Sequence, residues 1–592
     1  MVDGGVTRAA EPRAGPSQTR GVDWRLTTVA LVPSLCFCAA FVARSSWTRD
    51  GQRRFTLFDD AMISMSYGRT LARGGGLVWF EGAPRVEGIS NPLWTLFMAA
   101  LHSAGLEGSA AALAVMLAGV VLILATSLIA ASLVARLVPS SRWAPPFAAL
   151  AVSLTYPFVF WTLRGMEVGL LTFLTMASIV LAAGLADETA TSSARRVVLL
   201  AAVLAMGVAT RLDFAIVVAV IVIWLAVVRR SRRASMALGL AGTVGIVIGA
   251  MTVARHEYYG ALVPNTYVLK LTGVSLAQRL RRGLVTDVRI APMALLGVTG
   301  LVVLWRAADT KTRQTLALVT AVAIVPVLYS TYVGGDAWEG IGNRYTVPSL
   351  LCATVVVVAA GGWIASRGPL SRRPSVPLAA CVVAAFALTG LLVNGHPRST
   401  SSVVLVVALG VLGSIGVALL GRGSQIRWGL IVVAAVSAVF ASSAASGQAW
   451  FRSGGQVVTS DAENTDYGLF LAKITGERAV IASVRAGAIA YYSDRPSIDI
   501  LGKSDEHVAS SHPRGSFRPG HNKWDYTYSV GQLHPDVVAQ LFKPVPADFA
   551  LLRAAGYQQR CVRVGHVTHN LWVRRASKRI RWHALRAARC GK

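Results

Sequence analysis

The sequence places the apolar run LTTVALVPSLCFCAAFVA, residues 26–43, shortly before the acidic segment FDDAMI, residues 58–63. The run is close to the ~20 residues that a helix needs to cross a bilayer, and no small-residue cleavage site follows it. Residues 1–23 are polar and contain arginine. We therefore expect a cytoplasmic N-terminal tail over residues 1–23, an anchoring first helix, and an acidic pair at the membrane surface directly after it.

The composition indicates that most of the chain lies in a membrane. Of 592 residues, 54% are hydrophobic and 15% are charged, and the mean hydropathy is +0.53. Soluble domains carry roughly 25% charged residues. Apolar runs recur from Leu26 to about Ala445, which predicts about thirteen membrane-spanning helices. The expected fold class is a mainly α, polytopic membrane protein with a transmembrane domain over residues 24–446.

The formal net charge of +29 does not indicate a nucleic-acid partner. Most of the basic residues are arginines that fall in short loops and in the last twenty residues. Such loops are expected on the cytoplasmic side of a membrane protein, where basic residues accumulate. We expect membrane lipids, and no nucleic acid, among the partners.

The basic loops fix a topology once the N-terminus is placed in the cytoplasm. The first outer loop then covers about residues 45–108, and everything after Gly447 lies outside a cell membrane that the chain crosses many times. The loops assigned to the cytoplasm are residues 136–142, 195–196, 229–233, 306–313, 367–373 and 422–427.

The same topology collects most acidic residues of the membrane region on the outer side. Carboxylates at membrane depth are costly unless they face a cavity or a partner, so their clustering predicts a site. Two alternatives remain: Arg211 and Asp213 could form an ion pair that ends a helix, and Glu167 could cap a helix start. The outer segments are residues 58–61, 86–92, 164–167, 211–213, 258–270 and 334–345.

Asp59 and Asp60 are the candidate catalytic residues. Two adjacent carboxylates repel each other, which raises the pKa of one and prepares it to accept a proton. Glycosyl transfer from a lipid phosphate needs such a base, together with cationic side chains that receive the departing phosphate.

The segment DDAMISMSYGRTLARGGGLVWFEGAPRVEGISNPLW, residues 59–94, resembles the first outer loop of the GT-C glycosyltransferases. The chain is similar in particular to the terminal arabinofuranosyltransferases of mycobacterial cell-wall arabinan. This likeness extends to RGMEVGLL (164–171), GGDAWEGIGNRY (334–345) and GHNKWD (520–525). The likeness covers about residues 45–540 and departs at ISNPLW, residues 89–94, which leaves the sugar and acceptor open. It implies an inverting transferase that uses a polyprenyl-phosphate sugar, arabinofuranose in this family, with Asp59 as the base and an envelope glycan or lipid as acceptor.

Further site residues are proposed from their positions on the outer side. Lys270 and Arg344 are candidates for the leaving phosphate, although both could instead be anchors at the membrane interface. We expect no metal or other required cofactor, although Asp59, Asp336 and Glu339 could together hold a divalent cation. The donor and phosphate candidates are Lys270, Arg344, Asn265 and Arg211, and the acceptor or sugar candidates are Glu87, Glu167, Asp336 and His521.

An exported α/β domain is expected over residues 447–572, followed by a basic tail over residues 573–592 that rests on anionic lipid or polymer. Residues 479–482, 488–492 and 497–501 are typical of short strands. His521 lies in a polar and aromatic cluster suited to a sugar, although the domain could equally only cap the helices. Cys561 and Cys590 could pair outside the cell.

Two rival functions stay open at this stage. A transporter or flippase predicts acidic residues at mid-span and two similar halves, and no clear internal repeat is present. A non-catalytic envelope or motility factor could have kept the fold, against which the acidic pair and its surrounding loop argue.

Overall fold

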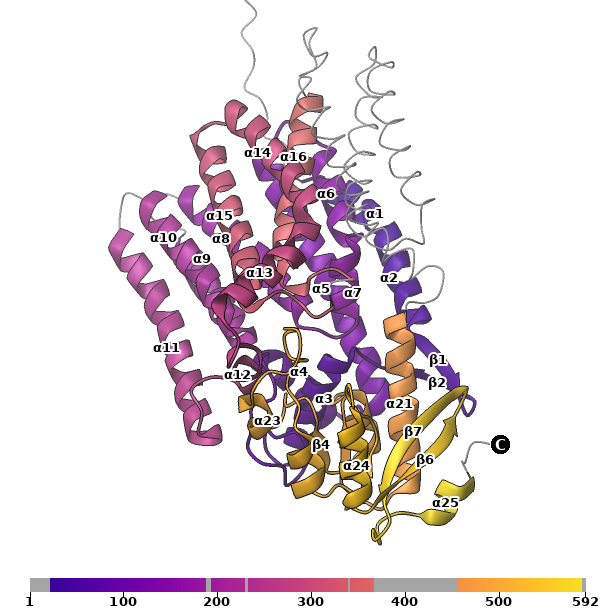
Figure 1. The fold of residues 1–592 in the computed structure, drawn as a ribbon. Helices are drawn as coiled ribbons and strands as arrows, with labels where there is room; N and C mark the ends of the chain where they lie inside the picture. The colour runs from indigo at the N-terminus through magenta and orange to yellow at the C-terminus, as the bar shows by residue number, and fades with distance from the viewer. Residues whose placement is uncertain (1–21, 188–192, 229–232, 339–340, 367–455, 588–592) are drawn as a thin grey trace, which may run out of the picture.

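The computed structural model describes residues 22–187, 193–228, 233–338, 341–366 and 456–587. A helical bundle forms one part of the molecule, and an α/β domain packs against one end of the bundle (Figure 1). The fold class predicted from the sequence is confirmed: the chain is mainly helical, with several membrane-length helices and a C-terminal α/β domain.

The bundle is built from the first part of the chain. Its helices are α1 (Trp24–Ala30), α2 (Val32–Arg44), α3 (Asp59–Ala72), α4 (Pro92–Ser103), α5 (Gly108–Leu137), α6 (Ala144–Ser153), α7 (Tyr156–Leu163), α8 (Val168–Asp187), α9 (Ser193–Thr210), α10 (Ala215–Val228), α11 (Arg233–Tyr259), α12 (Asn265–Leu271), α13 (Leu276–Asp287), α14 (Ala291–Ala307), α15 (Thr310–Val333) and α16 (Val347–Ser366). A hairpin of β1 (Ser46–Arg49) and β2 (Gln52–Phe55) joins α2 to α3.

Seven helices within the described residues are long and apolar enough to cross a membrane. The pair α6 and α7 would add an eighth as one broken span, bent by 52°. Pro157 stands in the first turn of α7, where its missing N–H prevents the helix of α6 from continuing without interruption. The sequence-based count of about thirteen spans includes runs in residues 367–455, which lie outside the described residues.

The α/β domain contains a mixed sheet in the order β4-β3-β5-β7-β6. Strands β4, β3 and β5 are parallel, and β7 and β6 add an antiparallel hairpin. Its elements are α21 (Gln456–Ile474), β3 (Ile481–Ser483), α22 (Ala488–Ser493), β4 (Ser497–Asp499), α23 (Glu506–Ser510), a π-helical turn (Thr527–Gln532), β5 (Val537–Val538), α24 (Pro546–Ala554), β6 (Tyr557–Val564), β7 (Val567–Arg574) and α25 (Trp582–Ala587).

Alternate residues of each strand face opposite sides of this sheet, as the period of two requires. Ile481, Val537 and Val573 pack against residues of α21, and Ala482 and Val538 pack in the core on the other side. The second core includes Leu552 of α24. The sheet is therefore buried on both faces, which gives its loops a fixed frame.

Two details of the sequence-based prediction for this domain were wrong. Residues 488–492 form helix α22 rather than a strand. Residues two apart share one face of a strand but lie on opposite sides of a helix, and Ile489 and Tyr491 pack in different cores. The basic tail expected from residue 573 is folded as far as residue 587, because Val573, Ile580 and Leu585 are buried in the domain core. Cys561 is disulfide-bonded, whereas Cys590, its expected partner, lies outside the described residues.

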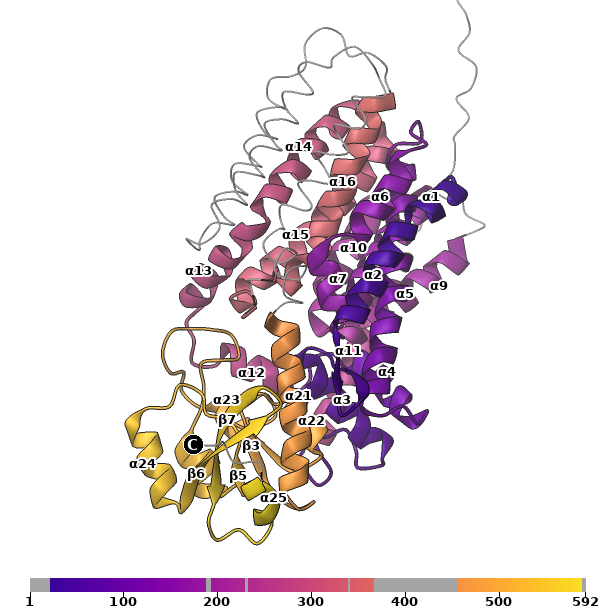
Figure 2. The ribbon, with the colours of Figure 1, turned by 90° about the vertical axis from the view of Figure 1, so that its right-hand side faces the viewer.

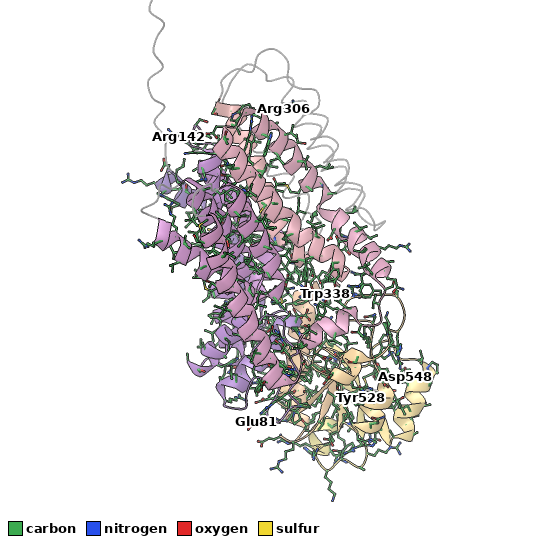
Figure 3. The ribbon with its side chains drawn as sticks, turned by 90° about the vertical axis from the view of Figure 1, so that its left-hand side faces the viewer. Glu81, Arg142, Arg306, Trp338, Tyr528 and Asp548 are labelled. Atoms are coloured by element: carbon green, nitrogen blue, oxygen red, sulfur yellow. The ribbon has the colours of Figure 1, made fainter. Side chains whose placement is uncertain are left out.

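The two ends of the molecule differ in the residues they carry (Figure 3). Arg142 and Arg306, from two loops predicted to be cytoplasmic, lie at the end of the bundle away from the α/β domain. Glu81, Tyr528 and Asp548 lie at the opposite end. This separation agrees with the predicted sorting of basic loops to one side. Which side faces the cytoplasm stays a prediction.

Candidate active site

A cavity of about 690 Å³ lies where the α/β domain meets the bundle. All six segments that the topology placed on the outer side contribute to its wall, and the α/β domain closes it with two loops. The residues that line it are Asp60, Ile63, Ser64, Gly88, Ile89, Ser90, Asn91, Met166, Glu167, Arg211, Thr266, Leu269, Lys270, Gly335, Asp336, Ala337, Arg344, Tyr345, Lys503, Pro519, Gly520 and His521.

Asp60 is the acidic centre of this wall. Its Oδ1 accepts a hydrogen bond of 2.6 Å from Lys503 Nζ, and its Oδ2 accepts one of 3.0 Å from Arg344 Nη1. Burial alone would raise the pKa of Asp60, but the charges of Lys503 and Arg344 outweigh burial and hold the pKa below its usual value. Asp60 is therefore ionised and bridges two cations of the cavity, and the raised pKa that the sequence predicted for one acid of the pair is not found at Asp60.

Asp59 faces away from the cavity, although it is the neighbour of Asp60. Its side chain is 1% exposed, its Oδ1 accepts the Ala488 N–H at 3.0 Å, and its Oδ2 has no hydrogen-bond partner among the described residues. Both acids stand in the first turn of α3, where successive side chains point about 100° apart around the helix axis. One carboxylate therefore meets the cavity and the other meets helix α22.

Arg211 is held by two acids from different segments. Its Nη1 lies 2.8 Å from Glu167 Oε1, and its Nε lies 2.9 Å from Asp213 Oδ1. Asn91 donates a hydrogen bond of 3.0 Å to the other oxygen of Glu167. The local Arg211–Asp213 pair considered from the sequence exists, but Arg211 also ties the loop before α8 to the loop after α9. Glu167 is likewise engaged with Arg211 and Asn91.

Lys270 is the one cation of the wall that no carboxylate neutralises within the described part of the chain. Its Nζ donates a hydrogen bond of 3.1 Å to the Tyr345 hydroxyl and lies 5.8 Å from the centre of that ring. Arg211, Arg344 and Lys503 each pair with at least one acid. Lys270 therefore offers an uncompensated positive charge to an incoming anion.

Asp336 reaches the cavity from the bundle, and His521 reaches it from the α/β domain. The loop that carries Asp336 leaves α15 through Gly334 and Gly335, both with positive φ, where a Cβ on Gly335 would lie 2.7 Å from Thr286. Asp336 Oδ2 lies 3.3 Å from Arg344 Nε. Burial, helped by the charge of Lys503, lowers the pKa of His521 to about 3, so its imidazole is neutral.

Glu87 and Asn265, both predicted to bind substrate, do not line the cavity. Glu87 is buried against Arg255 of α11 in a two-point ion pair. Asn265 donates its side-chain N–H groups to backbone carbonyls of the α/β domain, so its amide is engaged away from the cavity. Glu87 therefore links the first outer loop to α11, and Asn265 links α12 to the α/β domain.

Lys503 is the charged residue of the described wall that the sequence did not indicate. It follows strand β4 in the loop before α23, and its side chain reaches Asp60 across the boundary between the two parts of the chain. A weak signal was present, because lysine is rare in this arginine-rich chain and loops after parallel strands often carry functional groups.

A second cavity of about 510 Å³ adjoins the first inside the bundle. The two share Glu167, Arg211, Arg344 and Tyr345. The rest of its wall is mainly apolar and comes from α8, the turn before α10, α10, α15 and α16, including Leu171, Phe214, Val217, Val325 and Pro326. A charged cavity and a mainly apolar cavity thus meet at two arginines, a glutamate and a tyrosine.

Within the described residues, no group of three or more His, Cys, Asp or Glu side chains could hold a metal ion. Glu339, one of the three acids considered for a divalent cation, lies outside those residues. Of the other two, Asp336 lines the cavity and Asp59 does not.

Comparisons with known proteins bear on the fold of the chain. A family described as a domain of unknown function, DUF8728, matches residues 454–581. No curated protein sequence matches the chain. Among solved structures, ArnT from Cupriavidus metallidurans in the apo state is 16% identical with a TM-score of 0.54, over 92% of this chain and 98% of ArnT. ArnT bound to undecaprenyl phosphate is 13% identical with a TM-score of 0.53, over 93% of this chain and 98% of ArnT.

The oligosaccharyltransferase AglB from Archaeoglobus fulgidus, in complex with an inhibitory peptide and a dolichol-phosphate, is more distant. It is 11% identical with a TM-score of 0.47, over 92% of this chain and 74% of AglB. The similarity of ArnT over nearly the whole length of both chains shows that the two proteins share a fold.

Proposed function

We propose that the chain is a membrane glycosyltransferase that moves a sugar from a polyprenyl-phosphate donor to a hydroxyl group of a cell-envelope glycan or lipid. One observation carries the proposal: a charged cavity with an uncompensated lysine adjoins a mainly apolar cavity inside the bundle. A lipid phosphate has a charged head and an apolar chain, and it matches this pair of cavities. ArnT, whose fold is similar, has been crystallised with undecaprenyl phosphate.

The phosphate of the donor would bind at Lys270, near the hydroxyl of Tyr345. Lys270 is the preferred site for the phosphate because its charge is not neutralised by a carboxylate, whereas Arg344 already pairs with Asp60 and Asp336. Arg344 and Arg211 flank the place where the two cavities join, and they add positive charge around the leaving group.

Asp60 is the base in this proposal, because it is the member of the acidic pair that lines the cavity. The acceptor hydroxyl oxygen forms a bond to the anomeric carbon while the bond from that carbon to the phosphate oxygen breaks. The bonding electron pair leaves with the phosphate, and the hydroxyl proton passes to Asp60. Attack opposite the leaving group inverts the anomeric configuration.

Arabinofuranose is the donor sugar that we propose, on the resemblance of residues 59–94 and 334–345 to the arabinofuranosyltransferases. Glu167, Asp336 and His521 are the wall residues left to contact sugar hydroxyls. The neutral His521 ring can either donate or accept a hydrogen bond. The proposed reaction takes place on the outer face of the cell membrane, the side predicted for the cavity from loop charge.

A donor panel tests this function. The purified full chain in lipid nanodiscs is incubated with polyprenyl phosphates that carry arabinofuranose, mannose, glucose or galactose, with envelope extract as acceptor. The proposal predicts release of polyprenyl phosphate together with sugar incorporation for one donor. Flipping of the donor across a liposome membrane without release would instead identify a transporter.

A further inference from the structure

Asn265, at the start of helix α12, joins the bundle to a loop of the α/β domain. Its Nδ2 lies 2.9 Å from the carbonyl oxygens of both Gly502 and Lys503, and 3.3 Å from that of Asp505. Its own backbone N–H donates to the Glu87 carbonyl at 3.1 Å. The Asn265 side chain is buried, so these bonds form away from water, where losing them is costly.

The same loop is fixed from other directions. Asp499 accepts the backbone N–H groups of Leu501 at 3.0 Å and Ser504 at 2.9 Å. Gly88 of the first loop packs so closely that a Cβ there would lie 3.1 Å from the Lys503 carbonyl oxygen. With its backbone held in this way, the loop presents the Lys503 side chain to the cavity, where Nζ meets Asp60.

We infer that Asn265 is a positioning residue that fixes Lys503 in the transferase cavity, so that the α/β domain supplies part of the active site. This inference rests on the proposed function and deepens it. The alternative, a domain that only caps the bundle, would leave no reason for a cation of the domain to bind the acid proposed as the base.

Lys503 has a defined chemical task in this arrangement. Asp60 is faced by Lys503 and His521 from the α/β domain and by Arg344 from the turn just before α16, with Asp59 beside it on α3. Among these groups, Lys503 and Arg344 carry the positive charge that keeps Asp60 ionised. Loss of either charge makes Asp60 easier to protonate, which removes the base as the pH falls.

A pH profile separates positioning from mere stability. Lys503→Met should lower kcat and move the acid limb of kcat/KM to higher pH by about 1 unit, because an opposite charge within reach shifts a carboxyl pKa by that order. Asn265→Ala should move the limb in the same direction, and the Asn265→Ala/Lys503→Met double variant should move it no further than Lys503→Met. Lys503→Arg should restore most of the shift, and exposed Lys473→Met is the matched control.

Binding of undecaprenyl phosphate is a second measurement that needs no turnover. It is read from the rise in melting temperature of the full chain. Lys503→Met and Asn265→Ala should each weaken binding about tenfold, which corresponds to about 1.4 kcal/mol. A wild type that transfers sugar while Asn265→Ala leaves both the acid limb and binding unchanged overturns the inference alone. A wild type that binds the lipid phosphate but transfers no sugar contradicts the proposed function. The inference is then decided by whether Lys503→Met and Asn265→Ala weaken that binding. A wild type that does neither contradicts both.

Discussion

The Lys503 ammonium nitrogen lies 2.6 Å from Asp60 Oδ1, although 443 residues separate the two in the chain. Asp60 follows the first membrane helix, and Lys503 belongs to the C-terminal domain. The α/β domain lies against one end of the bundle (Figure 2). The charged cavity is complete only when these two parts are docked, because both line it. This pair links the acidic motif seen in the sequence to a domain whose role the sequence left open.

The two acids of the pair should respond differently to substitution. Asp60→Asn removes the proton acceptor from the cavity, and general-base loss lowers the rate about 10²–10⁴-fold. Asp59→Asn should cost less, because the amide oxygen can still accept the Ala488 N–H. Steady-state kinetics with a polyprenyl-phosphate donor measures both. Full activity in Asp60→Asn together with an inactive, folded Asp59→Asn would make Asp59 the base, as the family resemblance implies.

Lys270 should govern binding of the lipid phosphate. Lys270→Met removes the uncompensated charge with little loss of volume, so we expect weaker undecaprenyl phosphate binding and a higher KM. Lys270→Arg should keep part of the affinity, because the charge survives with a different geometry. Microscale thermophoresis gives the dissociation constants, and the melting temperature checks the fold. Unchanged affinity in Lys270→Met would show that Lys270 only anchors α12 and would move the phosphate role to Arg344.

A buried ion pair should hold the α/β domain on the bundle. Arg164 Nη2 lies 2.7 Å from Asp461 Oδ2, and both side chains are almost fully buried. Removing one partner of such a pair leaves an uncompensated charge, at a cost of about 3–5 kcal/mol. Asp461→Ala should therefore lower the melting temperature and increase proteolysis between the domains. Exposed Glu81→Gln should change neither, and an equally stable Asp461→Ala would show that other contacts dock the domain.

The membrane topology can be tested on the full chain with single cysteines. His566→Cys lies in the exposed turn between β6 and β7, and Ser140→Cys lies in a basic loop near Arg142. A membrane-impermeant maleimide should label His566→Cys in intact cells and should label Ser140→Cys only after lysis. Wild type gives the background from the native cysteines. The reverse labelling pattern would place the cavity on the cytoplasmic face.

The sequence predicted where the site lies better than it predicted which atoms face it. Loop charge and hydrophobic runs assigned Glu167, Arg211, Lys270 and Asp336 to one side, because these signals are local and periodic. The roles of Asp59 and Asp60 depend on the rotation of α3 against its neighbours, which a pair of identical adjacent residues does not encode.

Long-range contacts account for the other differences. Lys503 reaches the cavity, and Asn265 reaches the loop that carries Lys503, through packing between distant segments, and the sequence does not show which distant segments meet. Residues 488–492 are too short for periodicity to separate helix from strand. In the basic C-terminal segment, isolated apolar residues such as Ile580 and Leu585 fix the fold, although arginines dominate the composition.

Transfer of labelled sugar from polyprenyl-phosphate arabinofuranose by the purified chain is the most direct test of the central claim. Wild type in nanodiscs, given envelope extract as acceptor, should release polyprenyl phosphate and incorporate an equal amount of sugar, and Asp60→Asn should lose about 10²–10⁴-fold of this rate while it still binds undecaprenyl phosphate. Incorporation from another sugar of the panel would correct only the donor. No release of polyprenyl phosphate from any donor by folded wild-type protein, or equal release by Asp60→Asn, would contradict the account.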